Sequence, residues 1–221
     1  MTREAYHKAL KELQNELMAM GDMVSNAIRR SIDSLEKRDI EVSKEIIKND
    51  IFINKKRFEI EERCLLLIAT QQPMAVDLRT IAAILSITTD LERIADHAEG
   101  IARINVMVGK ESLVRQLTEI PKMAEKGLSM LSRCLKTFIE RDAESARAIC
   151  DEDNEVDLLY DGIIRELILL MVENPKVIEG ATYLIWAAHN LERIADRVTN
   201  IAERVVFMVT GRMEEINVSK Y

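Results

Sequence analysis

Hydrophobic residues recur at alternating steps of three and four along the first 35 positions of the chain. This spacing keeps one side of a helix apolar, so it predicts a helix of about ten turns that packs as in a left-handed bundle. Arg38 and Asp39 mark the end of this helix, and Asp39 suits the N-cap of the next. The predicted inward seam consists of Leu10, Leu13, Leu17, Met20, Val24, Ala27, Ser31 and Leu35.

Two further helices follow from the same periodicity. One runs from Glu41 to about Gln72, where Pro73 stops it, and the other runs from about Asp77 to Val108, with Gly109 as the C-cap residue. The second helix turns Val42, Ile46, Ile53, Ile60, Cys64 and Leu67 inward. The third turns Ile81, Ile84, Leu85, Leu91, Ala95, Ala98 and Ala102 inward.

The second half of the chain repeats this plan. The hexapeptide Leu91–Asp96 returns unchanged as Leu191–Asp196, and earlier positions align at an offset of 103. An internal repeat of this length points to gene duplication. The predicted fold is therefore all-α, with two tandem antiparallel three-helix bundles, residues 1–110 and 111–221, related by a pseudo-twofold axis. A polar link over residues 110–119 joins the bundles, and Pro121 suits a helix start.

The net charge, the apolar runs and the cysteines of the chain exclude several classes of protein. The net charge of −7 argues against a nucleic-acid binder, because phosphate contacts need a basic face. No apolar run approaches the roughly 20 residues that span a bilayer. The first 17 residues are charged and amphipathic, unlike a signal peptide, and three cysteines lack metal-like spacing. These features predict a cytoplasmic protein.

Carboxylates at helical spacing are the candidate chemistry. Each hexapeptide holds a Glu and an Asp four residues apart, so both lie on one helix face. The preceding helix of each half carries a second oxygen-bearing pair that interrupts its apolar stripe. Oxygen ligands favour hard cations such as Mg²⁺, Ca²⁺, Mn²⁺ or iron, and one amide in place of a carboxylate weakens the first site. The predicted metal ligands are Glu92, Asp96, Asp50 and Asn54 in the first half and Glu192, Asp196, Asp153 and Asp157 in the second.

Two other interpretations stay open at this point. The acids could form ordinary solvated helix faces braced by the nearby arginines. A carboxylate-bridged metalloenzyme in a helical bundle is the second alternative, but it needs two Glu-x-x-His motifs, and only Glu4 and His7 match. His97 and His189 are not repeated between the halves, so a shared ligand role is not indicated.

Three motifs resemble those of the PhoU family of phosphate-signalling regulators, which commonly has Gly at the Ala95 and Ala195 positions. The motifs are Gln72-Pro73-x-Ala75-x-Asp77-Leu78-Arg79, Asp90-Leu91-Glu92-Arg93-Ile94-Ala95-Asp96-His97-Ala98 and Asn190-Leu191-Glu192-Arg193-Ile194-Ala195-Asp196. In the second half Val177-Ile178-Glu179 replaces Asp77-Leu78-Arg79, so any role of that element is expected in the first bundle only.

The resemblance implies six helices in two bundles, a cytoplasmic homodimer and no enzymatic activity. It further implies a negative regulator of phosphate uptake and starvation signalling. Such a regulator contacts the ATPase subunit of the phosphate ABC transporter and a sensor histidine kinase, and it meets the membrane only through these partners. The family's E(D)xxxD motifs, here Glu92, Asp96, Glu192 and Asp196, imply bound iron, manganese, magnesium or zinc ions.

Overall fold

The computed structural model describes residues 3–109 and 119–216, and the predicted boundary between the bundles at residues 110 and 111 lies outside them. Within these residues the chain is all-helical, as the periodicity predicted. The elements in order are α1 (Arg3–Lys37), α2 (Ile40–Gln71), α3 (Val76–Val108), α4 (Glu119–Glu140), α5 (Ala143–Asp151), α6 (Asp153–Glu173), the 3₁₀ turn η1 (Pro175–Val177) and α7 (Ile178–Thr210).

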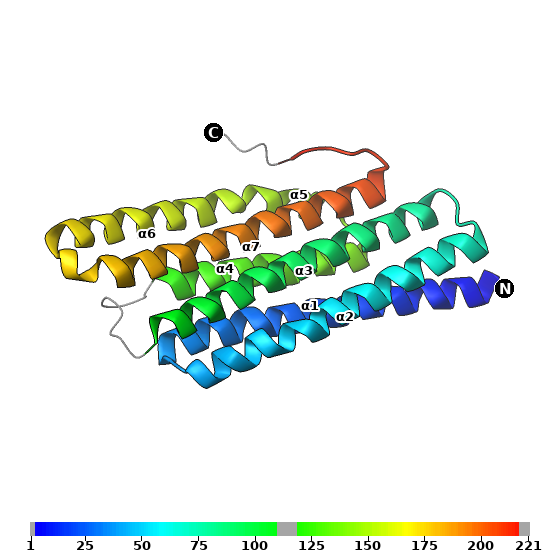
Figure 1. Cartoon of the computed structure of the whole chain (residues 1–221). Helices are drawn as coiled ribbons and strands as arrows, with labels where there is room; N and C mark the ends of the chain where they lie inside the picture. Colours follow the sequence, from blue (N-terminus) through cyan, green and yellow to red (C-terminus); the bar gives the residue numbers. More distant parts are fainter. Residues whose placement is uncertain (1–2, 110–118, 217–221) are drawn as a thin grey trace.

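The helices form two bundles that lie side by side (Figure 1). In the first bundle α1, α2 and α3 all pack on one another, and in the second α4, α5 and α6 surround α7. The long helices α3 and α7 run next to each other at the centre, and α1 also contacts α4. A single hydrophobic core extends through both bundles. The two repeats are therefore one packed unit.

The turns after α1 and α4 are built in the same way. Asp39 accepts a hydrogen bond from the Val42 N–H at 3.0 Å, which confirms the predicted N-cap of α2. At the equivalent place in the second repeat, Asp142 accepts from two backbone N–H groups and begins α5. Arg38 and Arg141, which precede these caps, have φ of 58° and 57°. The left-handed residue ends each preceding helix, so the duplication extends to backbone conformation.

The predicted seam of α1 is buried almost throughout, and Leu17, Met20 and Val24 are fully enclosed. On α2 the sequence prediction was wrong for Val42, which is half-buried, while the neighbouring Ser43 is fully buried. Asn105 explains this, because its side-chain amide donates to the Ser43 hydroxyl at 2.9 Å. A buried hydroxyl with hydrogen-bond partners is tolerated in a core.

A polar cluster therefore joins all three helices of the first bundle. The Asn105 amide also donates to the Ser34 carbonyl at 2.8 Å, and the Ser43 hydroxyl donates to the Ser34 hydroxyl at 2.9 Å. Ala146 and Val205 stand at the positions of Ser43 and Asn105 in the second repeat, so this cluster is not duplicated.

The sequence predicted one continuous fifth helix, but the structure divides it into α5 and α6. Glu152 separates them, with φ of −73° and ψ of −15°. Its carboxylate binds Arg133 at 2.5 Å and Lys126 at 2.6 Å, both on α4. These contacts hold the pKa of Glu152 down, to about 2. They anchor the junction, and Asp153 follows it in the first turn of α6.

Arg79, near the start of α3, contacts the second bundle. Its Nε donates to the Met208 carbonyl at 3.2 Å, and its guanidinium lies against Gly211, the C-cap residue of α7. A cation at a helix C-terminus satisfies a free carbonyl and complements the helix dipole. This element of the first repeat thus contacts the second bundle, and Glu179 at the equivalent position of the second repeat cannot supply the same cation.

Throughout residues 3–109 and 119–216, no helix combines the length and apolar character needed to cross a membrane.

Candidate functional site: two carboxylate clusters

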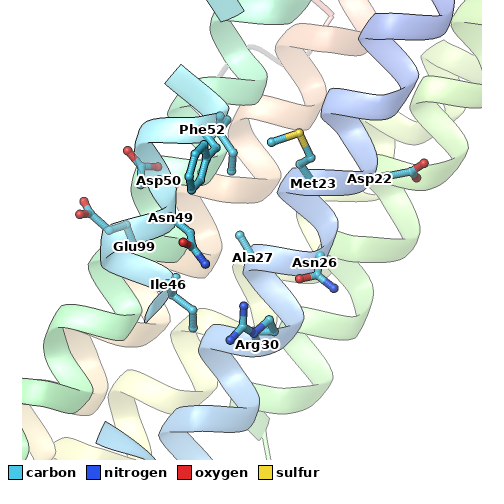
Figure 2. Close-up of a pocket in the computed structure, with 12 residues that line it drawn as sticks. Asp22, Met23, Asn26, Ala27, Arg30, Ile46, Asn49, Asp50, Phe52 and Glu99 are labelled. Carbon is cyan, nitrogen blue, oxygen red and sulfur yellow. The ribbon is translucent and has the colours of Figure 1, made fainter. Parts of the chain in front are cut away.

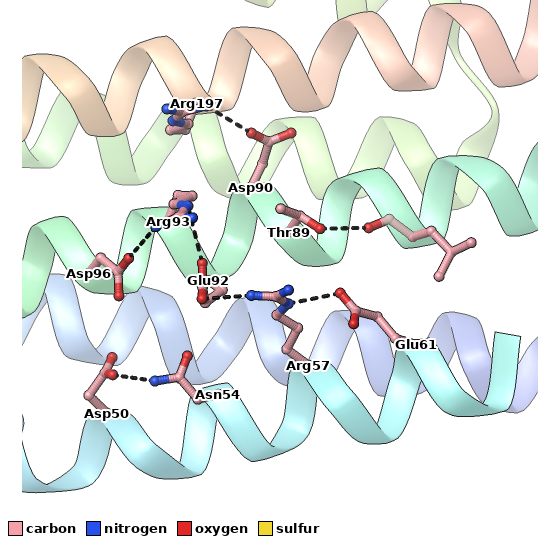
Figure 3. Close-up of polar contacts among 11 residues, drawn as sticks. Asp50, Asn54, Arg57, Glu61, Thr89, Asp90, Glu92, Arg93, Asp96 and Arg197 are labelled. Atoms are coloured by element: carbon pink, nitrogen blue, oxygen red, sulfur yellow. Dashed lines mark hydrogen bonds and ion pairs between the residues drawn. The ribbon is translucent and has the colours of Figure 1, made fainter. Parts of the chain in front are cut away.

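The first cluster forms where α2 faces α3. Asp50 and Asn54 project from α2, and the Asn54 amide donates to the Asp50 carboxylate at 2.7 Å (Figure 3). The pKa of Asp50 is raised to about 6, chiefly by burial and then by the negative charges of Glu99, Asp96 and Glu92 on α3. The predicted residues of the first half therefore meet in one field of negative charge.

Glu99 belongs to this cluster and was missed by the sequence analysis. It lies seven residues after Glu92 and three after Asp96, so all three acids share a face of α3. Thr199 takes its place in the second repeat, which is why a search for duplicated acids overlooked it. Its carboxylate binds Arg103 at 2.6 Å.

A pocket of about 460 Å³ opens beside the first cluster (Figure 2). Asp50 and Glu99 are among its lining residues, together with Met23, Asn26 and Arg30 of α1. Its walls come from all three helices of the first bundle. The carboxylates of Asp50 and Glu99 are therefore reachable from solvent.

Arginines neutralise part of the first cluster. The Arg57 guanidinium on α2 binds Glu92 at 2.7 Å and Glu61 at 2.8 Å, and Arg93 binds Asp96 at 3.2 Å (Figure 3). Glu92 is only 8% exposed, so its ion pair with Arg57 is largely shielded from water. The interpretation of the acids as a helix face braced by arginines therefore describes Glu92 and Asp96 of the first cluster.

The second cluster has less positive charge near its carboxylates than the first cluster has. Burial raises the pKa of Glu192 to about 7, and the charges of Asp196 and Asp157 contribute. The pKa values of Asp157 and Asp196 are also raised, in both cases mainly by burial. Arg193 binds Asp196 at 2.5 Å, but Tyr160 stands at the position equivalent to Arg57.

One oxygen of Glu192 has no hydrogen-bond donor. Glu192 Oε2 is fully enclosed, and the imidazole Nδ1 of His189 lies 3.4 Å away without forming a hydrogen bond with it. A buried carboxylate oxygen without a donor costs free energy unless a cation compensates it. Glu92 Oε2 is likewise enclosed without a hydrogen-bond donor, but Arg93 lies 3.5 Å from it and Arg57 binds the other oxygen of Glu92. Glu192 is therefore the less compensated of the two motif glutamates.

Asp153, the other predicted ligand of α6, is buried near Cys150. It is 3% exposed, and its charge helps to raise the pKa of the Cys150 thiol. The carboxylate of α6 that raises the pKa of Glu192 is Asp157. The assignment of Asp153 as a ligand stays a prediction, and Asp157 is the better supported residue of the two.

The donor chemistry of both clusters fits a hard cation, because carboxylates converge from two helices. In the side-chain positions of residues 3–109 and 119–216, however, no three carboxylate, imidazole or thiol groups form a set ready to hold a metal ion. The second cluster fits a metal better than the first, since Arg57 binds Glu92 in the first and Tyr160 stands at the position of Arg57 in the second. The uncompensated Glu192 oxygen is the observation behind this ranking.

Between the two clusters, α3 and α7 make two polar contacts that are related by the repeat. Asp90 lies 3.5 Å from Arg197, and His97 Nδ1 lies 3.1 Å from Asn190 Oδ1. Asp90 is equivalent to Asn190 and His97 to Arg197, so the same two positions meet twice across a pseudo-twofold axis. A Cβ on Gly100 would come within 2.8 Å of Asn190, so this glycine permits the close approach. His97 serves the contact between repeats.

The fold and the clusters together define a class: duplicated three-helix bundles that share one core and carry an acidic pair on the last helix of each repeat. Comparison with known proteins then identifies the family. The PhoU domain model matches residues 17–104 and 120–205, and the chain belongs to the PhoU family.

Relatives match over nearly the whole chain. A phosphate-specific transport system accessory protein PhoU homolog of Clostridium acetobutylicum is 37% identical, covering 98% of this chain and 100% of the relative. The homolog of Rhizobium meliloti is 33% identical, over 94% and 88%. These relatives are accessory proteins, which agrees with the prediction of no enzymatic activity and disfavours the metalloenzyme alternative.

Two crystal structures share the fold. PhoU from Pseudomonas aeruginosa gives a TM-score of 0.89 at 32% identity and covers 94% of this chain and 100% of its own. The phosphate transport system regulatory protein PhoU from Streptococcus pneumoniae gives 0.89 at 31% identity, over 95% and 99%. The two-repeat helical fold predicted from the sequence is therefore confirmed.

Proposed function

We propose that this protein is a non-enzymatic negative regulator of phosphate uptake and phosphate-starvation signalling in the cytoplasm. It acts through contacts with the ATPase subunit of the phosphate ABC transporter and with a sensor histidine kinase, and it works as a homodimer. The observation that carries this proposal is the match of both repeats to the PhoU domain, with relatives whose names give the accessory and regulatory role.

The two carboxylate clusters are the sites where cations act on this regulator. Glu92, Asp96, Asp50 and Asn54 hold the first ion site, and Glu192, Asp196, Asp157 and Asp153 hold the second. A bound iron, manganese, magnesium or zinc ion supplies positive charge that lowers the repulsion among the acids. Each cluster lies between two helices, so neutralising its charge fixes how those two helices pack. The packing of the helices in turn determines the surface that the partner proteins contact.

The second site binds cations more tightly than the first. Arg57 already neutralises Glu92, and Asn54 contributes no charge, whereas Tyr160 and Asp157 hold the equivalent positions in the second repeat. An added cation must compete with Arg57 for Glu92 in the first repeat. In the second repeat it meets a carboxylate oxygen that has no hydrogen-bond donor.

The first experiment measures metal content and partner binding in the same samples. We expect Glu192→Ala with Asp196→Ala to lower the metal content of protein purified without chelator. The same variant recovers less transporter ATPase and sensor kinase from cells held in ample phosphate. Glu41→Ala with Glu45→Ala is the matched control, because these exposed acids have the same spacing on α2. Unchanged metal occupancy in the first variant would reject the site assignment.

A reciprocal exchange tests the ranking of the two sites. Arg57→Tyr removes the internal cation of the first cluster and should strengthen metal binding there, measured by calorimetric titration of chelator-treated protein. Tyr160→Arg introduces a cation beside the second cluster and should weaken binding there. If neither substitution changes metal affinity, Arg57 does not control access of ions to the first cluster.

A further inference from the structure

The outward face of α2 carries a hydrophobic stripe that the fold leaves in solvent. Its five large side chains are each between 55% and 65% exposed, although the opposite face of α2 fills the core. Large apolar side chains gathered along one exposed helix face are typical of interaction sites. We define the α2 stripe as Ile51, Phe52, Phe58, Leu65 and Leu66.

The spacing of the α2 stripe is that of a coiled-coil seam. Ile51, Phe58 and Leu65 recur every seven residues, and Lys55 and Glu62 fall between them at steps of four and three. A heptad seam of this kind packs against another long helix. The stripe covers 16 residues, or about 24 Å of helix at 1.5 Å per residue, so it needs a helical partner of similar length.

The charges within the stripe indicate which helix that is. Lys55 and Glu62 are both exposed, and neither pairs with an opposite charge within the described part of the chain. They lie on either side of Phe58, three residues before it and four after it. An antiparallel copy of α2 centred near Phe58 therefore brings each Lys55 beside the partner's Glu62. A parallel copy would instead set like charges against each other.

We infer that a second copy of this chain docks antiparallel on the α2 stripe, with α2 packed on α2 across a twofold axis near Phe58. The arrangement is self-complementary, as a twofold interface must be. Two reciprocal ion pairs flank the central phenylalanines. Beyond them, Ile51 and Phe52 of one protomer pack against Leu65 and Leu66 of the other.

The equivalent face of α6 lacks these features. It exposes Leu158, Ile168, Leu169 and Val172, but Asp161 replaces the central phenylalanine. Arg165 is already 3.8 Å from Asp161 on the same helix. Asp161 and Arg165 are therefore already engaged with each other, whereas Lys55 and Glu62 on α2 pair with no opposite charge in the described residues, and this difference assigns the dimer contact to the first repeat. This inference names the face of the dimer included in the proposed function.

Sedimentation velocity of the full chain, with and without chelator, tests the inference. We expect a dimer for the wild type and a monomer for Phe58→Asp with Leu65→Asp, with circular dichroism confirming the helical fold of each. Leu158→Asp with Leu169→Asp on α6 is the matched control and should stay dimeric. A monomeric wild type, a dimeric α2 variant or a monomeric α6 variant overturns the proposal.

Charge reversal gives a second test that leaves the apolar contacts intact. Lys55→Glu alone and Glu62→Lys alone should each weaken the dimer by at least about tenfold, because two attractive pairs become repulsive. The double variant, Lys55→Glu with Glu62→Lys, should restore the wild-type dimerisation constant. Failure of the double variant to recover dimerisation rejects the antiparallel register. These measurements need neither metal nor the transporter and kinase partners. A dimeric α2 variant therefore rejects the α2 interface alone, whereas a monomeric wild type also rejects the homodimer of the proposed function.

Discussion

Replacing Glu192 by glutamine should stabilise the metal-free protein at alkaline pH. The pKa of Glu192 rises from 4.5 to about 7 in the folded chain, chiefly through burial and then through the charge of Asp196. The folded chain therefore holds this proton more tightly than the unfolded chain. The free energy of unfolding falls as pH rises between 4.5 and about 7, and the whole penalty is present above that window. Glutamine keeps the shape and removes the charge.

The magnitude follows from the size of the pKa change. A rise from 4.5 to about 7 corresponds to about 3 kcal/mol at pH 8. The Glu192 side chain is 14% exposed and retains some contact with water, so we expect a gain of about 2 kcal/mol. For a chain of this length that gain raises the midpoint of thermal unfolding by about 4–8 °C. At pH 5 only about a quarter of the gain should remain.

Thermal and urea unfolding of chelator-treated protein at pH 5 and pH 8 measures this effect. Glu92→Gln is the matched control at the equivalent position of the first repeat. Glu92 binds Arg57, so its neutralisation should destabilise the protein by about 1–3 kcal/mol. A general change in surface charge would alter the free energy of unfolding in the same direction at both equivalent positions, so opposite changes point to the local environment of each glutamate. If Glu192→Gln destabilises at pH 8, or stabilises equally at both pH values, the account of an uncompensated carboxylate is wrong.

Three further predictions concern the fold and are measured by urea unfolding. Asn105→Ala removes the buried amide that links the helices of the first bundle and should cost about 2–3 kcal/mol. Phe138→Ala empties a fully buried ring site in α4 and should cost about 3–5 kcal/mol. Asp90→Ala leaves Arg197 without its partner between the repeats and should cost about 1–3 kcal/mol, whereas Asp33→Ala at an exposed pair should change stability by less than about 0.5 kcal/mol.

The sequence was sufficient to predict the helices and their pairing into repeats. Heptad-like spacing predicted the ends of α1 and α3 to within about one residue. A long apolar seam at this spacing can be buried only if the segment is helical. The caps at Asp39 and Gly109 followed from local backbone chemistry that needs no tertiary context. The duplicated hexapeptide Leu91–Asp96 predicted which helices hold equivalent acids.

The sequence was not sufficient to predict how charges are shared inside the clusters. Arg57 has no counterpart in the second repeat, and its choice of Glu92 depends on the distance between α2 and α3. Glu99 was overlooked for the related reason that the repeat does not preserve it. The break before α6 depends on Glu152 reaching two cations of α4, which is a tertiary contact. The pairing of Arg57 and the anchoring of Glu152 are thus interactions between side chains on different helices, which the spacing along one helix does not reveal.

The contact between α3 and α7 gives the duplicated clusters a physical route of communication. Arg197 pairs with Asp90 of the first repeat, and its positive charge also opposes the rise in the pKa of the neighbouring Asp196. His97 of the first repeat acts on Asp196 in the same direction. A carboxylate of the second cluster thus feels groups from both repeats. We therefore expect a cation bound at the second cluster to change the electrostatic balance at the joint between the bundles.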